Sequence, residues 1–75
     1  MSLNKNDIVK LSDNNSYLVI SKVLYNDVYY FYIVDILDNS NFKIFSIKND
    51  NIIEIKDSKI LDKIIKLMIF DLRPN

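Results

Sequence analysis

The sequence predicts an α+β fold in which an antiparallel β-meander of about five strands precedes one C-terminal α-helix. Runs rich in Val, Ile, Tyr and Phe alternate with Asn- and Asp-rich turns roughly every 12 residues. After residue 57 the apolar residues adopt a helical period. The 75 residues suit a single domain, and the 49% hydrophobic content can supply its core. The pattern leaves open whether the sheet stays open or curls into a small barrel.

Each strand is expected between turn signals. The first strand is predicted at residues 7–11, where DIVKL alternates, and a polar turn follows at 12–15. The central hairpin joins residues 16–25 to residues 28–37 through Asn26 and Asp27, which tolerate the positive φ of a two-residue turn. Two shorter strands are predicted at residues 42–48 and 52–56.

The two-residue turn fixes the expected register of the hairpin. The predicted pairs are Tyr25–Val28, Leu24–Tyr29, Val23–Tyr30, Lys22–Phe31, Ser21–Tyr32, Ile20–Ile33 and Val19–Val34. Both faces are largely apolar, so neither can be fully exposed to water. We expect the helix to cover the face that carries Ile20, Phe31 and Ile33. The other face, with Tyr25, Tyr30 and Tyr32, is then a candidate interaction surface.

The helix is predicted at residues 58–70, with Asp57 or Ser58 as its N-cap and Pro74 after its end. One polar stripe of helical period runs along it: Lys59, Asp62, Lys63 and Lys66. Most of the remaining circumference is apolar, and Ile69 and Phe70 widen the apolar arc beyond what a small sheet needs. Either the C-terminal tail shields the excess, or a flank of the helix forms a dimer or partner interface. Ile69 and Phe70 therefore join the candidate interaction surface.

The composition removes most catalytic chemistry. The sequence has no His, no Cys and no Gly, so it lacks the usual general base, the usual metal ligands and glycine-rich phosphate loops. We predict a non-enzymatic protein with no cofactor, no metal site and no small-molecule substrate. Asp13, Asp38 and Asp50 lie in separate turns without the order of ligands of a calcium loop. Asp35, inside an apolar run, is expected near a strand end where it reaches solvent or a lysine.

Charge does not favour nucleic acid as a partner. Ten basic and ten acidic residues give a net charge of zero, and the central hairpin holds only Lys22 as a cation. The aromatic run Tyr29, Tyr30, Phe31 and Tyr32 could stack on single-stranded bases, but such proteins pair aromatics with a basic groove. No apolar run is long enough for a signal peptide or membrane span, so a cytoplasmic protein is expected.

The order of short motifs in this chain resembles small uncharacterised proteins of AT-rich Firmicutes. The motifs are NDIVKL, YLVISKV, YYFYIVDI, FKIF and the closing SKILDKIIKLM. The chain is distantly similar to the YrzB-like family of unknown function and to small SH3-like folds that begin with a short D-I-V-x-L strand. This resemblance implies a small β-rich domain, and it assigns no activity and no functional residues.

We predict a protein-interaction or regulatory module that binds a protein partner or itself, as a homodimer. The missing catalytic residues, the two-sided apolar hairpin and the apolar helix all favour this function. An alternative is an inhibitor of a host defence or replication enzyme, encoded by a phage or mobile element. Small size and the abundance of Asn, Ile, Lys and Tyr, whose codons are AT-rich, agree with it. Single-stranded nucleic-acid binding is a weaker alternative.

Overall fold

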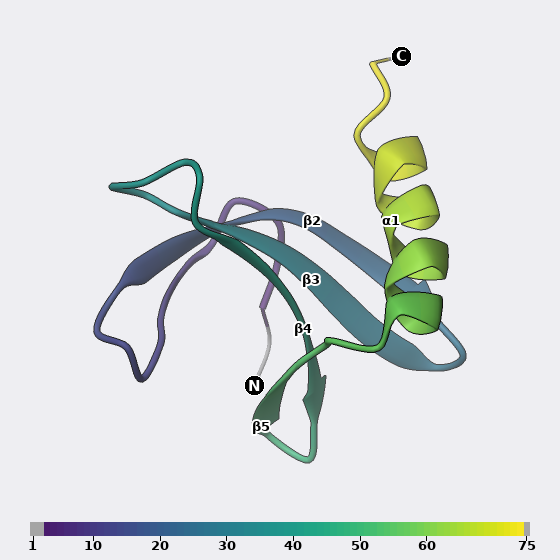
Figure 1. The fold of residues 1–75 in the computed structure, drawn as a ribbon, viewed down its shortest axis with the longest axis horizontal. Helices are drawn as coiled ribbons and strands as arrows, with labels where there is room; N and C mark the ends of the chain where they lie inside the picture. The colour runs from purple at the N-terminus through teal and green to yellow at the C-terminus, as the bar shows by residue number, and fades with distance from the viewer. Residues whose placement is uncertain (1–2, 75) are drawn as a thin grey trace.

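The computed structural model describes residues 3–74, and it shows a five-stranded antiparallel sheet with one helix packed against it (Figure 1). The strands lie side by side in chain order, from β1 to β5. The sheet curls into an open half-barrel. The predicted α+β meander with a C-terminal helix is therefore confirmed.

The structure sets the bounds of each element. The strands are β1 (Ile8–Lys10), β2 (Ser16–Tyr25), β3 (Val28–Asp35), β4 (Phe42–Lys48) and β5 (Asn51–Glu54), and the helix is α1 (Ser58–Asp71). β1 and β3 are shorter than the expected 7–11 and 28–37, and β5 begins and ends before the expected 52–56. β3 ends at Asp35 because its carboxylate accepts the Leu37 N–H at 2.8 Å and turns the chain.

Two hairpins use the same dipeptide in their turns. Asn26 and Asp27 join β2 to β3 with φ angles of 50° and 63°, as predicted for a two-residue turn. Asn49 and Asp50 join β4 to β5 with φ angles of 52° and 63°. Asn and Asp tolerate the left-handed region better than other residues with a Cβ atom, so this glycine-free chain can still form tight turns.

A bulge in β2 changes the predicted register. The pairs from Tyr25–Val28 to Ser21–Tyr32 are those predicted, but Val19 then pairs with Ile33 and Ile20 has no partner in β3. The predicted pairs Val19–Val34 and Ile20–Ile33 are therefore wrong. One extra residue in a strand transfers the side chains beyond it to the opposite face. Tyr17 and Val19 consequently pack on one face of the sheet, while Val23 and Tyr25 pack on the other.

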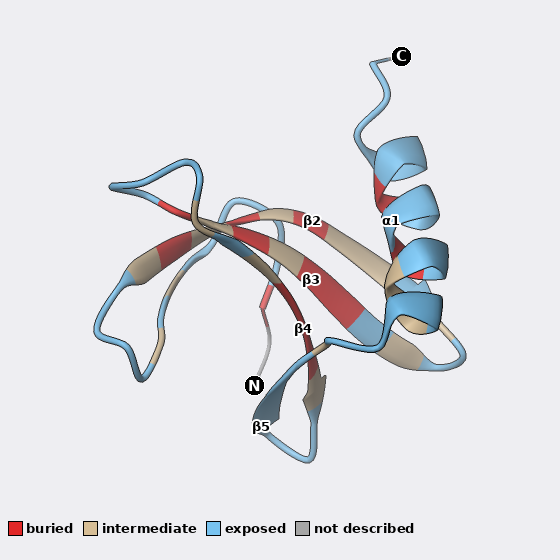
Figure 2. Ribbon diagram, viewed as in Figure 1, coloured by how far each residue is buried: buried red, intermediate tan, exposed pale blue. Residues whose placement is uncertain are grey.

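Two apolar clusters result, one on each face of the sheet. Figure 2 shows that their buried residues lie along the middle of the strands and on α1. The inner core lies on the hollow side of the half-barrel and is formed by Leu3, Tyr17, Val19, Phe31, Ile33 and Phe45. The helix-side core is formed by Tyr30, Ile44, Ile64 and Met68, with Val23, Tyr25, Tyr32 and others packed against it. The rings of Phe31 and Phe45 stack in the inner core, with centroids 5.2 Å apart.

The helix covers the face opposite to the one expected. α1 packs over Tyr30, with Tyr25 and Tyr32 beside it, whereas Phe31 and Ile33 belong to the inner core. The expectation that α1 covers Ile20, Phe31 and Ile33 is wrong. The physical reason is that the curl of the sheet, together with Leu3 from the N-terminal segment, already buries the inner face. The other face has no such closure, so it needs the helix.

Side-chain hydrogen bonds fix both ends of α1. The Asp57 carboxylate accepts the N–H groups of Lys59 and Ile60 at 2.9 and 3.4 Å, which makes Asp57 the N-cap. At the other end the Ser21 hydroxyl donates to the Asp71 carboxylate at 2.6 Å. Ser21 is fully buried, so this bond attaches the last turn of the helix to β2. Across residues 3–74, no helix is long and apolar enough to cross a membrane.

Candidate interaction surfaces

The three candidate tyrosines do not form a free surface. Tyr30 is only 8% exposed, and its ring lies 6.5 Å from that of Tyr25 beneath α1. Tyr25 is half-buried, with the Lys63 ammonium 6.0 Å from its ring centroid. Tyr32 is half-buried and stacks on Phe42 at 5.8 Å. The expectation that this face is left uncovered is wrong, because these rings complete the helix-side core.

The two helical candidates, by contrast, are exposed. Ile69 is 58% and Phe70 is 71% exposed. Adjacent helical residues point about 100° apart, so the two side chains lie on different flanks of α1. Ile69 follows Ile65 by four positions and precedes Leu72 by three, which places these three on one flank. Phe70 in the same way shares its flank with Leu67 and Lys63.

The flank of Phe70 borders a strand edge that has no neighbouring strand. β1 pairs only with the first part of β2, from Ser16 to Leu18, and the segment before β1 bonds only as far as Val19. Within residues 3–74, no strand pairs with the part of β2 from Ile20 to Tyr25 on the side away from β3. In a two-residue hairpin the residues next to the turn bond to each other, and the pattern then alternates. The backbone N–H and C=O groups of Lys22 and Leu24 therefore point away from β3, towards this edge.

A groove runs between this edge and the last turns of α1. It encloses about 620 Å³ and is lined by Val23, Leu24, Leu67, Phe70, Asp71, Arg73 and Pro74. Figure 1 shows that α1 crosses β2 and that its C-terminal turns lie beyond the strand. Of these lining residues, sequence reasoning identified only Phe70. The short run DIVKL beside a ten-residue β2 is the signal that could have revealed the unpaired edge.

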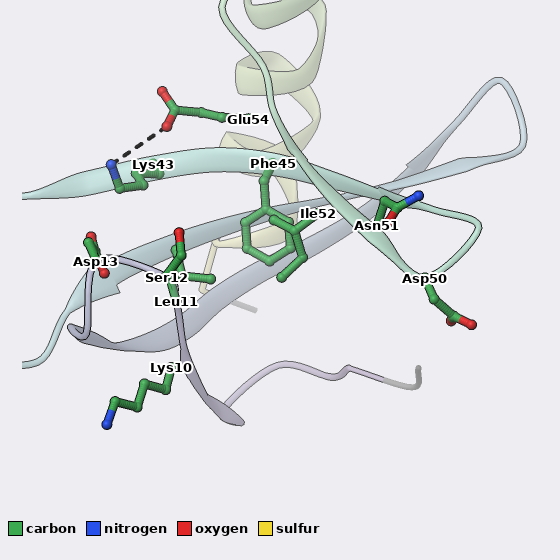
Figure 3. Close-up of a pocket in the computed structure, with 10 residues that line it drawn as sticks. All are labelled: Lys10, Leu11, Ser12, Asp13, Lys43, Phe45, Asp50, Asn51, Ile52 and Glu54. Carbon is green, nitrogen blue, oxygen red and sulfur yellow. Dashed lines mark ion pairs between the residues drawn. The ribbon is translucent and has the colours of Figure 1, made fainter.

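A second hollow lies at the opening of the half-barrel, between the β1–β2 turn and β5 (Figure 3). It encloses about 460 Å³, and the Phe45 ring and Ile52 lie at its centre. Its charges are mixed, and Lys43 forms an ion pair with Glu54 at 3.6 Å across β4 and β5. The Lys10 side chain points away from the hollow. A ligand here would find apolar contacts and charges of both signs, without a clear preference for one class.

Asp13, which lines this hollow, belongs to a network of hydrogen bonds that links the β1–β2 turn to the β3–β4 turn. The hydroxyl of the fully buried Tyr17 donates to the Asp13 carboxylate at 2.6 Å and accepts the Asn41 amide at 3.2 Å. The Tyr17 hydroxyl and the Asn15 N–H hold the pKa of Asp13 below its ordinary value. The Asn41 amide also lies 3.2 Å from the Asp35 carboxylate.

Asp35 itself departs from the prediction. It does end a strand, but it is only 5% exposed and its carboxylate accepts the Leu37 N–H and the Asn41 amide. The expected contact with solvent or a lysine is wrong for this residue. Hydrogen bonds to nearby donors satisfy the buried carboxylate, which gives Asp35 a structural place in the β3–β4 turn.

By its fold and surfaces, the protein belongs to the structural class of curled antiparallel meanders with one packed helix, and the flanks of that helix expose apolar side chains. In the part of the chain that the structure describes, no group of three or more acidic side chains is arranged to hold a metal ion. Comparison of the chain with known protein families, with curated proteins and with solved structures finds no match. The inference of function therefore rests on the surfaces described above.

Proposed function

We propose that this protein is a non-enzymatic interaction module that binds another protein through an apolar flank of α1. The observation that carries the proposal is the exposure of Ile69 and Phe70, at 58% and 71%, on a helix whose buried residues, Ile64 and Met68, seal a core. Large exposed apolar side chains beside a groove are typical of interaction sites. The module would act as an accessory or regulatory protein that offers a surface and performs no reaction.

The burial of Tyr30 and Phe31, two members of the aromatic run, supports a protein partner over nucleic acid. Stacking on bases needs free ring faces, yet Tyr30 and Phe31 are buried in the two cores. Lys22, the one cation of the central hairpin, is engaged by the Asn4 side chain at 3.1 Å and lies 4.6 Å from the Tyr29 ring centroid. Neither feature provides the basic aromatic groove that single strands require.

Site-specific photocrosslinking in the source cell tests this function. A benzophenone amino acid replaces Phe70 in one variant, Ile69 in a second and Asp62 in a third. Asp62 lies on the polar stripe with a side chain 66% exposed, so it serves as a matched control on the same helix. We expect a discrete protein adduct from position 70, position 69 or both, and none from position 62. Equal yields at all three positions, or no adduct at any, would contradict the proposal.

A further inference from the structure

We propose that the groove between the unpaired edge of β2 and α1 binds an extended segment of a partner protein as an added strand. This inference rests on the proposed function and names its site and partner class. The backbone groups of Lys22 and Leu24 point to the edge, so an extended chain can bond to both residues. Leu67 and Phe70 overhang the same groove and can contact the side chains of that segment.

The position of α1 favours a slender segment over a second copy of this chain. α1 is fixed to β2 at Ser21 and packs over Tyr25, so it lies above the very stretch whose edge is free. Two β2 strands paired antiparallel about a twofold axis would be about 4.8 Å apart, with both helices on the same face. Helices pack about 8–10 Å apart, and the last turns of α1 already lie beyond β2, so the two copies of α1 would overlap across this axis. An extended partner segment brings no second helix to this face, so it avoids this clash.

The charges around the groove indicate the chemistry of the segment. Arg73 lines the groove near one end of α1 and Lys63 lies on the same flank towards the other end, next to Tyr25. Asp71 also lines the groove, but its carboxylate is occupied by the Ser21 hydroxyl and by Lys5 at 3.6 Å. Among the described residues, neither Lys63 nor Arg73 forms an ion pair with a carboxylate. Arg73 in the groove and Lys63 in the adjoining hollow beside Tyr25 therefore place two cations along this flank of α1, which favours acidic residues on the partner.

The spacing of these groups sets the length of the segment. Lys63 and the last helical residue, Asp71, are eight positions apart, which corresponds to about 12 Å along α1, and Arg73 follows two residues later. In an extended chain, side chains on one face recur about every 6.6 Å. Two acidic residues with one or two apolar residues between them, at alternate positions, therefore match the two cations and the apolar contacts of Leu67 and Phe70. The predicted ligand is an acidic-flanked strand with an apolar centre.

A synthetic peptide can test the inference directly. The probe is the capped peptide Asp-Thr-Val-Thr-Val-Thr-Asp, and the control peptide has Lys at both ends. Binding to the full chain is measured by NMR titration, with the amides of Lys22 and Leu24 as reporters. We expect saturable binding of the acidic peptide, with slowed hydrogen exchange at both amides, and binding of the Lys-ended peptide about tenfold weaker or more.

Variants on the two flanks of α1 provide the matched control. Phe70→Ser should weaken binding about tenfold or more, whereas Ile69→Ser on the other flank should change it less than about twofold. Arg73→Glu should weaken the acidic peptide about fivefold and strengthen the Lys-ended peptide. All three side chains are exposed, and thermal unfolding checks that each variant keeps its fold.

Several results would overturn the inference. These are no saturable binding of the acidic peptide at millimolar concentration, equal losses from Phe70→Ser and Ile69→Ser, or unaffected amides at Lys22 and Leu24. A dimer in sedimentation that Phe70→Ser abolishes would show that the occupant is a second copy. If position 70 or 69 gives crosslinked protein adducts but the peptide does not bind, the proposed interaction function stands. Only the inference that the partner adds a strand to β2 is then overturned. Absence of adducts from both positions would remove the function itself.

Discussion

The two cores of this protein use the same sheet in different ways. The inner core holds Phe31 and Phe45 stacked at 5.2 Å and is enclosed by the curl of the sheet and by Leu3. The helix-side core is closed only by α1, through Ile64 and Met68. The apolar side chains packed around the inner core, Val9, Leu11 and Ile47, are at least half-buried, whereas the helix leaves apolar residues exposed on both of its flanks. The difference teaches that the inner face is closed by the sheet itself, whereas the helix side leaves the apolar surface on which the proposed function rests.

The bulge at Ile20 sets which side chains of β2 face each core, and deletions of single residues test this register most severely. Deletion of Ile20 leaves the pairs Val19–Ile33 and Ser21–Tyr32 adjacent in a regular ladder, so the protein should fold with a loss of about 1–2 kcal/mol. Deletion of Tyr32 shifts β3, which pairs on both sides and has no spare residue. The free energy lost with these pairs should exceed the total stability, which is about 4–11 kcal/mol for a chain of this size, so this variant should not fold.

Circular dichroism and urea unfolding distinguish the two deletion variants. A cooperative transition for the Ile20 deletion and none for the Tyr32 deletion is the expected result. If both deletions unfold the protein, Ile20 is needed for more than spacing. If both fold, the register of β3 is less strictly defined than its pairing with β2 and β4 indicates.

Truncation of one side chain in each core compares their contributions to stability. Phe31→Ala should lower the free energy of unfolding by about 4 kcal/mol, because a stacked and nearly fully buried ring is lost. Met68→Ala should cost about 2–3 kcal/mol, since a flexible side chain under a single helix leaves a site that can partly collapse. Urea unfolding measures both values. A larger loss for Met68→Ala would reverse the assignment of the inner core as the main source of stability.

Much of the fold could be predicted because its signals are local. Apolar runs between Asn and Asp turns specify the strands, and the Asn26–Asp27 turn fixes the hairpin register as far as Ser21. The helix and its Asp57 cap follow from period and capping chemistry. The bulge at Ile20 could not be predicted, because no glycine marks it and Ile20 is an ordinary β-branched residue in a strand-like run.

The face that α1 covers and the groove beside β2 depend on contacts between distant parts of the chain. Both faces of the hairpin are apolar, so the pattern alone could not decide that Leu3 and the curl would bury Phe31 and Ile33. That choice places Tyr30 under α1. Phe70 was identified from the excess of apolar residues on the helix. Its neighbours Val23 and Leu24 were missed, because the free edge appears only when the short β1 is placed beside β2.

The bond between Ser21 and Asp71 links the bulged strand to the helix end, and its removal should have a moderate effect. Ser21→Ala removes a 2.6 Å hydrogen bond to a carboxylate that stays partly exposed. The expected loss in the free energy of unfolding is about 1–2 kcal/mol. Amides of the last helical turn should exchange faster with solvent, while amides of the inner strands should not. Uniformly faster exchange would mean that the helix end and the sheet unfold as one unit.

The smallest expected effect concerns Asp13 at the edge of the inner core. The Tyr17 hydroxyl, followed by the Asn15 N–H, lowers the pKa of Asp13 in the folded protein. A lowered folded pKa means that the ionised form favours folding. The stabilisation is therefore fully present above the ordinary Asp pKa of about 3.9 and is lost as the pH falls through the lower folded value. Tyr17→Phe removes the hydroxyl bond, so its loss of stability relative to wild type should shrink as the pH falls through this window.

Urea unfolding of wild type and Tyr17→Phe between about pH 6 and pH 2 measures this difference. Ser40→Ala is a suitable control, since the Ser40 hydroxyl lowers the pKa of Asp38 in a turn outside both cores. It should show the same sign of pH dependence without the constant loss that Tyr17→Phe causes by removing the bond to Asn41. A difference between wild type and Tyr17→Phe that stays constant with pH would show that the hydroxyl stabilises the inner core through Asn41 alone. The hydrogen bond between Tyr17 and Asp13 would then make no contribution to the free energy of unfolding.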